Sequence, residues 1–210
     1  MTSYHEYVFD QSKRKFVGEF EAMYRQEGVS GFDSWHQDDI HSREDASVIL
    51  RQFEGRHFEW LVDLGCGKGA LTNALSGVAN SSLGVDVSPT AVHIARGRYP
   101  HLDFQVADLN DSNTVRELLR SLKNSESPSV LVVMSQVLSY LSEWREVVMA
   151  VSGNSNEFVV GLYLPDDPIG FVKSRDELEI EIRNCARVLS WHESVDSQQH
   201  VVFASAESRK

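Results

Sequence analysis

The sequence predicts an α/β fold: a doubly wound, mostly parallel seven-stranded sheet that ends in an antiparallel hairpin, preceded by an N-terminal helical cap. Three observations predict it. Short apolar runs alternate with segments of helical periodicity, as in sheets covered by helices. A glycine-rich turn, GCGKGA, directly follows the first of these runs. The chain ends in two strand-like runs separated only by residues 196–199.

The first 42 residues precede the alternating pattern. An early helix is predicted over residues 10–27, with Phe16, Phe20 and Met23 on one side. Residues 28–42 contain two glycines and several polar residues and are expected to form an entry loop. We therefore divide the chain into a cap with its entry loop, residues 1–42, and an α/β domain, residues 43–210, that forms a single globular unit.

Five apolar runs in the second part have strand character. Most are continuous rather than alternating in polarity, which is typical of parallel strands covered on both faces. The runs are residues 58–64, 83–87, 103–107, 130–134 and 158–164. Because each is followed by a helix, the strand–helix order predicts a doubly wound sheet.

Helices between the strands are predicted from apolar residues at positions i, i+3, i+4 and i+7. The spacing occurs at Ala46/Ile49/Leu50/Phe53, Leu71/Ala74/Leu75/Val78, Val115/Leu118/Leu119/Leu122 and Trp144/Val147/Val148/Val151. Another helix begins at Ser88, an N-cap serine before the first-turn Pro89. A late helix begins at the capping-box sequence of residues 174–177. The two last strands, residues 187–195 and 200–206, are joined too closely for any pairing but an antiparallel hairpin.

Length, charge and hydropathy exclude several classes of function. The 210 residues suffice for one domain with a substantial core, and the net charge of −11 argues against a nucleic-acid partner. No apolar stretch reaches the roughly 20 residues of a membrane span, and the N-terminus lacks the apolar region of a signal peptide. Cys66 and Cys185 are expected to be reduced thiols. We expect a cytoplasmic protein that binds neither nucleic acid nor membrane.

The glycine-rich stretch at residues 62–70, VDLGCGKGA, is compatible with two cofactors. With Ala70 in the last position it matches the dinucleotide pattern G-x-G-x-x-G/A. It equally matches the acidic-x-G-x-G-x-G loop of S-adenosylmethionine sites. Both cofactors require backbone to approach the ligand closely, which glycine permits. The loop alone leaves both readings open.

Three acids at the ends of successive strands favour S-adenosylmethionine. Asp63, Asp86 and Asp108 lie where ligands bind in such sheets. A carboxylate at Asp63 suits a cofactor with an ammonium and a sulfonium better than one with a pyrophosphate. Asp86 would bind ribose hydroxyls in either case. Asp108 would accept a hydrogen bond from adenine or simply begin a turn, and the sequence leaves both open.

From about residue 43 onward, the chain resembles the class I S-adenosylmethionine-dependent methyltransferases, a Rossmann-like superfamily. The resemblance is carried by four segments, VDLGCGKGA, LGVDVSPTAV, FQVADL and VLVVMSQVLSYL, and by the terminal hairpin. The entry segment, residues 32–44, is similar to the D-P-W…S-x-x-E pattern of small-molecule enzymes such as the nodulation N-methyltransferases. Residues 135–141 are similar to their S-E-x-L-x-Y-L segment. Ser34 replaces the proline of that pattern, and Gln136 replaces the acid.

The resemblance implies a site for S-adenosylmethionine, with S-adenosylhomocysteine as product. Residues around the methionine part would be Asp63, Gly65, Cys66, Gly67 and Gly69. The ribose and adenine would contact Asp86, Val87, Asp108 and Leu109. Ser135 and Gln136 would border the methyl group. Trp35 would either close over the cofactor or anchor the cap as a core aromatic residue.

An acceptor site is expected beyond the fourth and fifth strands, at Tyr140, Tyr163 and Asp166. Asp166 would receive a cationic acceptor or belong to a polar turn. A hydroxyl acceptor would need a base with a pKa near neutrality. Judged by their place in the chain, His36, His41 and His192 are the candidate bases. Each could equally be a solvent-exposed histidine of a loop or strand. No spacing typical of metal ligands is present, so no metal is expected.

We therefore expect methyl transfer from S-adenosylmethionine to nitrogen or oxygen of a small-molecule metabolite, by a monomer or homodimer. Two alternatives remain at this point. One is an NAD(P)-dependent oxidoreductase, which the loop pattern allows. The other is a non-catalytic S-adenosylmethionine-binding regulatory protein, which the replacement at Gln136 and the lack of an evident base allow.

Overall fold

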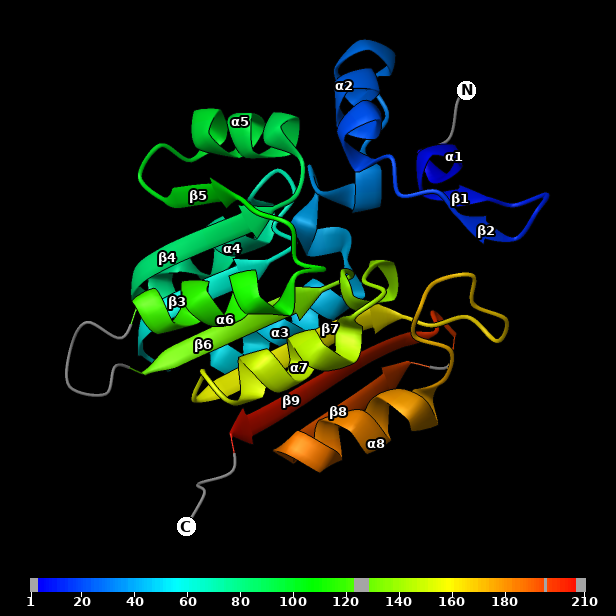
Figure 1. Ribbon diagram of the computed structural model, residues 1–210. Helices are drawn as coiled ribbons and strands as arrows, with labels where there is room; N and C mark the ends of the chain where they lie inside the picture. Colours follow the sequence, from blue (N-terminus) through cyan, green and yellow to red (C-terminus); the bar gives the residue numbers. More distant parts are fainter. Residues whose placement is uncertain (1–3, 123–128, 195, 207–210) are drawn as a thin grey trace.

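The computed structural model describes residues 4–122, 129–194 and 196–206, and a seven-stranded sheet forms its centre (Figure 1). The strands are β3 (Phe58–Leu64), β4 (Ala79–Asp86), β5 (Asp103–Val106), β6 (Val130–Ser135), β7 (Glu157–Tyr163), β8 (Ala186–Ser194) and β9 (Gln199–Ala206). Their order is β5-β4-β3-β6-β7-β9-β8, parallel from β5 to β7 and antiparallel at β9 and β8. The predicted fold class is confirmed.

Alternate residues of the central strands enter two apolar clusters, one on each face of the sheet. Val62 and Val132 pack toward one face, whereas Leu61 and Leu131 pack toward the other. Every residue of β6 is buried, which explains why its sequence, VLVVMS, shows no alternation of polarity. The continuous apolar runs therefore identified the strands correctly.

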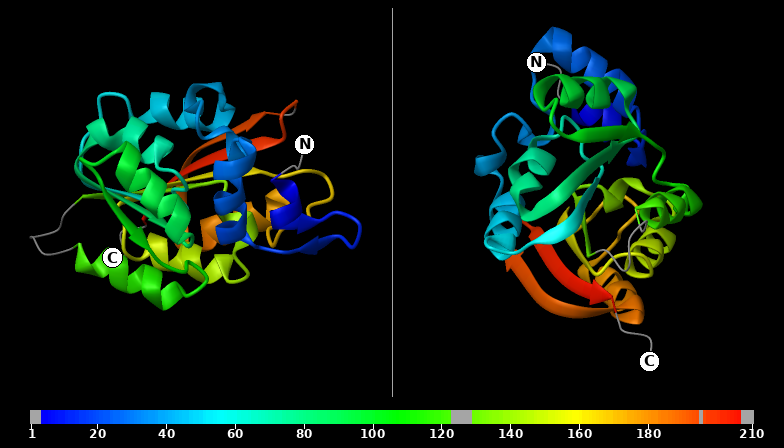
Figure 2. Two further views of the ribbon diagram at one scale, coloured as in Figure 1. Left: turned by 90° about the horizontal axis from the view of Figure 1, so that it is seen from above. Right: turned by 90° about the vertical axis from the view of Figure 1, so that its left-hand side faces the viewer.

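Helices cover both faces of this sheet (Figure 2). They are α3 (Glu44–Phe53), α4 (Ala70–Leu75), α5 (Pro89–Arg98), α6 (Ser112–Ser121), α7 (Trp144–Ser152) and α8 (Arg175–Cys185), with short 3-10 turns η3 (Ser76–Val78) and η4 (Leu138–Tyr140). Residues of α3 and α4 enter one apolar cluster, and residues of α6, α7 and α8 enter the other. The predicted caps are present: Ser88 Oγ accepts from Ala91 N (3.1 Å), and Ser174 Oγ accepts from Glu177 N (3.1 Å).

The N-terminal cap differs from the prediction of one helix over residues 10–27. It contains α1 (His5–Val8), a small hairpin of β1 (Phe9–Asp10) and β2 (Lys15–Phe16), and α2 (Phe20–Ser30). The Asp10 carboxylate accepts from Ser12 Oγ (2.7 Å) and Lys13 N (3.0 Å), and Arg14 adopts a left-handed φ of 49°. These local bonds make a turn that competes with the helix. The prediction was therefore wrong for the first half of this segment.

The entry loop contains two 3-10 turns, η1 (Ser34–His36) and η2 (Ile40–Ser42). The next helix, α3, begins at Glu44, just after the boundary that the sequence suggested. The division into residues 1–42 and 43–210 stays a prediction. The cap lies on the side toward which the parallel strands run (Figure 1).

The terminal hairpin has the expected antiparallel pairing, with a bulge between Val188 and Ser190. Val195, the last residue of the first predicted hairpin strand, lies outside the described residues. Nowhere in the described part of the chain does a helix combine the length and the apolar character needed to cross a membrane.

Candidate active site

The loop after β3 bends back across β4 through three glycines. Gly65, Gly67 and Gly69 have φ values of 81°, 53° and 82°, in the left-handed region that glycine adopts without strain. A Cβ on Gly65 would lie 2.6 Å from the Val137 side chain, and one on Gly67 would lie 2.2 Å from Gln37 Oε1. Both conformation and close approach therefore require glycine here, which makes a cradle at the carboxyl end of β3.

A cavity of about 650 Å³ opens above this cradle, within the roughly 300–1,000 Å³ of small-molecule sites. The cap supplies one wall and the sheet supplies the other. Most of the predicted site residues line it: Trp35, Asp63, Gly65, Cys66, Asp86, Val87, Asp108, Leu109, Ser135, Gln136 and Tyr140. Gly67 and Gly69 shape the loop but are not lining residues. The structure thus brings together residues that the sequence spreads over the whole chain.

Asp63 is a buried carboxylate at the end of β3. Its Oδ2 accepts from Thr72 Oγ1 at 2.6 Å. Burial raises the pKa of Asp63 to about 6, against the hydrogen bond from Thr72 and the charge of Arg43, while the negative charge of Asp86 adds to the rise. A cation placed in the cavity would favour the ionised carboxylate.

Asp86 ends β4 and is also buried. Its Oδ2 accepts from Gly67 N (2.9 Å) and its Oδ1 accepts from Ser88 N (2.9 Å), so it ties the glycine loop to the loop after β4. Burial raises the pKa of Asp86 despite these hydrogen bonds. Between the two acids, Cys66 is a buried thiol whose pKa is raised by burial and by the charges of Asp86 and Asp63.

Asp108 begins a turn, one of the two roles that the sequence left open, and its contact with adenine stays a prediction. Its Oδ1 accepts from Asn110 N at 2.9 Å and so begins a turn. It is exposed and also borders the cavity, beside the buried Leu109. Its turn-forming role leaves the carboxylate within reach of a ligand.

Sequence reasoning missed a buried acid, Asp45, beneath the cavity. Its carboxylate accepts from Arg43 Nη2 (2.7 Å), Ser135 Oγ (2.6 Å) and Gln136 Nε2 (3.1 Å). Burial by itself would raise the pKa of Asp45, but the Arg43 charge and these hydrogen bonds lower it. The only signal in the sequence is an acid at the start of an amphipathic helix, where the helix dipole alone would explain it.

Gln136 is held in a fixed orientation. It has a left-handed φ of 58°, and its Oε1 accepts from Tyr163 N (2.9 Å) while its Nε2 donates to Gln199 Oε1 (2.8 Å). The amide thus has partners on both of its polar atoms, including one in the terminal hairpin. Replacing the acid of the family pattern by Gln136 gives a neutral group that is fully engaged in the sheet.

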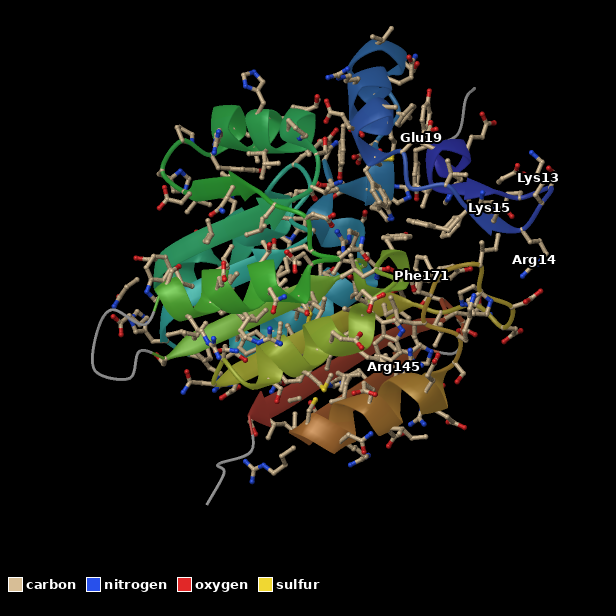
Figure 3. All side chains as sticks on the ribbon, in the orientation of Figure 1. Lys13, Arg14, Lys15, Glu19, Arg145 and Phe171 are labelled. Atoms are coloured by element: carbon tan, nitrogen blue, oxygen red, sulfur yellow. The ribbon has the colours of Figure 1, made fainter. Side chains whose placement is uncertain are left out.

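The outer half of the cavity is aromatic. Trp35 Nε1 donates to the Tyr140 hydroxyl (3.0 Å), and the Phe16 and Phe20 rings lie 6.2 Å and 5.5 Å from the Tyr140 ring. Trp35 packs in the cap, as one of its two expected roles requires, and it also lines the cavity; its closure over the cofactor stays a prediction. Glu19, labelled in Figure 3, is exposed and borders the same space.

The remaining candidates lie elsewhere. His36 is exposed on η1, His41 borders a second cavity of about 390 Å³, and the His192 ring on β8 is 5.8 Å from the Phe203 ring. Tyr163 and Asp166 are exposed and are not among the lining residues. In the described segments, no histidine lines the main cavity.

Comparisons with known proteins found a family and individual relatives that are similar to this chain in sequence, and solved structures that are similar to it in fold. Residues 62–154 match the model of a methyltransferase domain family. The chain is 26% identical over 120 residues to nodulation protein S of Bradyrhizobium diazoefficiens, covering 56% of this chain and 50% of that protein. It is 34% identical over 67 residues to putative methyltransferase 235L of Invertebrate iridescent virus 6, covering 31% and 25%. The chain thus spans half or less of the length of these curated relatives.

Solved structures share the fold. The N-methyltransferase NodS from Bradyrhizobium japonicum, in complex with S-adenosylhomocysteine, has a TM-score of 0.67 at 15% identity, covering 89% of this chain and 98% of that one. An S-adenosylmethionine-dependent methyltransferase from Anabaena variabilis has a TM-score of 0.67 at 13% identity, covering 90% and 93%. At these identities the likeness is one of fold.

Proposed function

On the premise that this chain is a class I S-adenosylmethionine-dependent methyltransferase by its domain match and fold, we propose that it methylates a small-molecule metabolite at nitrogen or oxygen. The comparisons confirm the predicted class and its cofactor, and on this basis we assign the glycine loop to S-adenosylmethionine. The observation that carries the proposal is one continuous cavity. It runs from the glycine loop to the aromatic residues of the cap, so that a cofactor and an acceptor would meet within it.

The residues at the inner end fit the cofactor. S-adenosylmethionine, when bound, supplies a methyl group on a positively charged sulfur. The Asp63 carboxylate would bind the ammonium of the methionine part, and the Arg43 guanidinium, which also lines the cavity, would bind its carboxylate. Asp86 would accept hydrogen bonds from the ribose hydroxyls. The glycine cradle admits the ligand because no Cβ intrudes.

The residues at the outer end favour an amine as acceptor. Besides Asp63, Asp86, Asp108 and Arg43, which the cofactor would engage, two acids and one arginine line the cavity: Glu19, Glu21 and Arg25. This acidic balance and the aromatic rings both attract cations. A hydroxyl acceptor would call for a base, and no described lining residue is a histidine. A neutral amine needs no base, and NodS, which has a similar fold, is an N-methyltransferase.

Calorimetry with S-adenosylhomocysteine and with NAD tests the cofactor. We expect binding of the first and none of the second. Binding of NAD with no response to S-adenosylhomocysteine would contradict the proposal. Release of S-adenosylhomocysteine is then measured with a panel of amines and a matched panel of phenols, and we expect turnover with amines. Cofactor binding with no turnover on either panel would favour the non-catalytic regulatory protein.

The pKa of Asp63 predicts a pH dependence of cofactor affinity. At about 6, it leaves the carboxylate ionised at pH 8 and mostly protonated at pH 5. Because an ammonium binds only the ionised form, affinity for S-adenosylhomocysteine is expected to fall below pH 6, approaching about tenfold per pH unit. Calorimetry between pH 5 and pH 8 measures this fall.

Asp63→Asn is the control for this experiment. The variant should bind S-adenosylhomocysteine more weakly than the wild type at pH 8 and should lose most of the pH dependence. The raised pKa of Asp86 would leave a residual slope. If the variant keeps the full wild-type slope, the dependence does not come from Asp63.

A further inference from the structure

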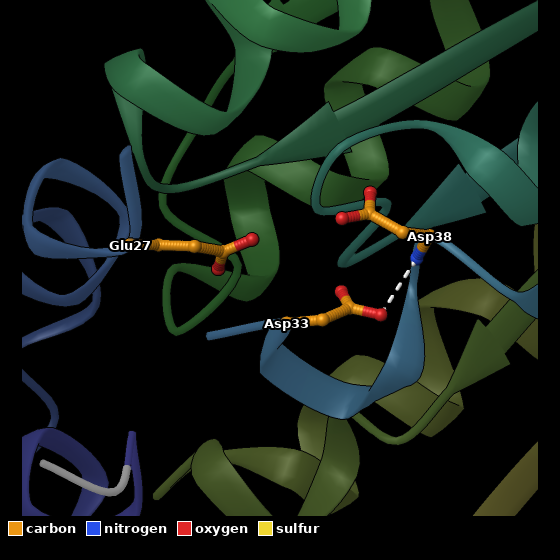
Figure 4. A group of neighbouring side chains, drawn as sticks. All are labelled: Glu27, Asp33 and Asp38. Atoms are coloured by element: carbon orange, nitrogen blue, oxygen red, sulfur yellow. Dashed lines mark hydrogen bonds between the residues drawn. The ribbon is translucent and has the colours of Figure 1, made fainter. Parts of the chain in front are cut away.

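Lys68 lies within the glycine loop, yet its side chain serves the cap. The side chain is 1% exposed, and its ammonium forms ion pairs with Glu27 of α2, with Asp33 (2.8 Å) and with Asp38 (2.9 Å). Figure 4 shows the three acids converging from α2 and the entry loop, with Asp38 N donating to the Asp33 carboxylate. One carboxylate oxygen from each of the three acids lies within 4.8 Å of the other two, a spacing suited to a cation. Lys68 supplies that positive charge.

The main chain of Lys68 makes a second connection to the cap. Lys68 N donates to Gln37 Oε1 at 2.6 Å. Gln37 Nε2 in turn donates to the Tyr24 hydroxyl (3.0 Å) and to Ser34 O (3.1 Å). Tyr24 and Gln37 both line the cavity. One residue of the glycine loop thus holds a wall of the cavity through its backbone and its side chain.

The anchored segment carries Trp35. Trp35 and His36 have left-handed φ values of 53° and 51°, which are uncommon for residues other than glycine and persist where surrounding contacts enforce them. The contacts of Lys68 with Asp33 and Asp38 bracket these two residues. Trp35 then reaches Tyr140 in the aromatic half of the cavity. The Lys68 contacts therefore set the position of an acceptor-side residue.

A second anchor joins α2 to the loop after β4. The Glu21 carboxylate accepts from Ser88 Oγ (2.6 Å), Thr90 N (3.0 Å) and Thr90 Oγ1 (2.7 Å). Burial by itself would raise the pKa of Glu21, but these hydrogen bonds and Arg25 lower it to about 2. Ser88 N also donates to Asp86. The cap is therefore fastened to the glycine loop and to the loop after β4, two of the segments that are expected to contact the cofactor.

We propose that Lys68 is a positioning residue that couples docking of the cap to cofactor binding. Without the ammonium, Glu27 and Asp33 would lose this cation, while Asp38 would keep its pair with Arg98 (2.5 Å). Repulsion among the three carboxylates would then weaken the docking of the cap on the glycine loop. Because coupling between two equilibria is reciprocal, a cofactor held by that loop stabilises the docked cap. The proposal rests on the proposed function, since it takes S-adenosylmethionine as the ligand of the loop.

The test replaces Lys68 by methionine, which has similar length and no charge. Calorimetry gives the affinity for S-adenosylhomocysteine, and limited proteolysis, with cleavage sites mapped to residues 31–42, reports cap docking. In the wild type, the ligand is expected to slow cleavage of this segment. In Lys68→Met, we expect affinity to fall about tenfold, as loss of a coupling of this size implies, and cleavage to stay fast even with ligand bound.

Two further measurements separate positioning from general damage. Millimolar Ca²⁺ should restore affinity and protection in Lys68→Met, because the three carboxylates would then hold a cation, and should leave the wild type unchanged. Arg145→Met removes a cation that pairs with Glu177 and Glu181 away from the cavity (Figure 3), and it should keep wild-type affinity. If Lys68→Met does not fold, Asp38→Asn removes the most exposed of the three acids and should lower affinity about threefold.

The outcomes distinguish this proposal from the proposed function. A wild type that does not bind S-adenosylhomocysteine contradicts the proposed function. A wild type that binds, together with a folded Lys68→Met that binds equally well, contradicts the coupling alone. Fast cleavage of residues 31–42 with unchanged affinity contradicts it as well.

Discussion

Replacing Asp45 by alanine is expected to lower the free energy of unfolding by about 3–5 kcal/mol. Asp45 is 3% exposed and its partner Arg43 is 12% exposed. The substitution leaves a mostly buried guanidinium without its counter-charge, and it removes the acceptor of Ser135 Oγ and Gln136 Nε2. Unsatisfied buried donors add to the cost. Urea denaturation of the cofactor-free protein measures the change.

Glu157→Ala is the matched control. Glu157 also pairs with an arginine through two hydrogen bonds, but that pair is more exposed, at 20% for Glu157 and 37% for Arg56. Its loss should cost about 1 kcal/mol or less. Because the pKa of Asp45 is lowered in the folded protein, its contribution is present above the unfolded pKa of about 4 and is lost as the pH falls below it. Equal losses for the two variants at pH 7 would contradict the role given to Asp45.

Gly67→Ala is expected to weaken S-adenosylhomocysteine binding by about a hundredfold, or about 3 kcal/mol. The new Cβ would lie 2.2 Å from Gln37 Oε1 and 2.7 Å from the Tyr24 hydroxyl. Gln37 cannot move aside cheaply, since it is buried and bonded to Lys68 N, the Tyr24 hydroxyl and Ser34 O. The loop must shift instead, and Gly67 N would leave Asp86. Calorimetry measures the loss.

Gly97→Ala provides the comparison for this variant. Gly97 lies in α5, and a Cβ there meets no atom within 4 Å. Alanine should therefore leave binding unchanged and stabilise the helix by up to about 1 kcal/mol. If Gly67→Ala binds S-adenosylhomocysteine as tightly as Gly97→Ala does, then the cradle does not depend on the glycine.

The parts of the fold that could be predicted are those with local signals. Buried parallel strands appear as apolar runs, and helices such as α5 and α8 begin at recognisable caps. The prediction of one early helix was wrong because Phe16 and Phe20 have helical spacing although they lie on different elements, β2 and α2. Asp10 and its local hydrogen bonds decided the turn between β1 and β2. Apolar spacing alone cannot report that competition.

In the candidate site, too, some residues could be predicted from local signals and others could not. Asp63, Asp86 and the glycines were found because each follows a strand at a fixed place in the chain. Tyr140 was found through a family pattern, whereas Phe16 and Phe20 were not assigned to the cavity. Their approach to Tyr140 depends on how the cap folds over the sheet. That packing leaves no periodic trace in the sequence.

The sequence by itself determined the α/β class, the glycine cradle and the acids around it, because these features depend on periodicity and on short spacings. Only the tertiary structure showed that Lys68 pairs with acids of the cap and that Asp45 accepts hydrogen bonds from Ser135 and Gln136. Lys68 is 41 positions from Glu27, and Asp45 is 90 positions from Ser135. The ion pair of Lys68 with Glu27 and the hydrogen bond of Ser135 to Asp45 join residues so far apart in sequence that they form only once the chain has folded. The burial and the partners of Lys68 and Asp45 therefore depend on the whole fold, and no single segment of the sequence reveals them.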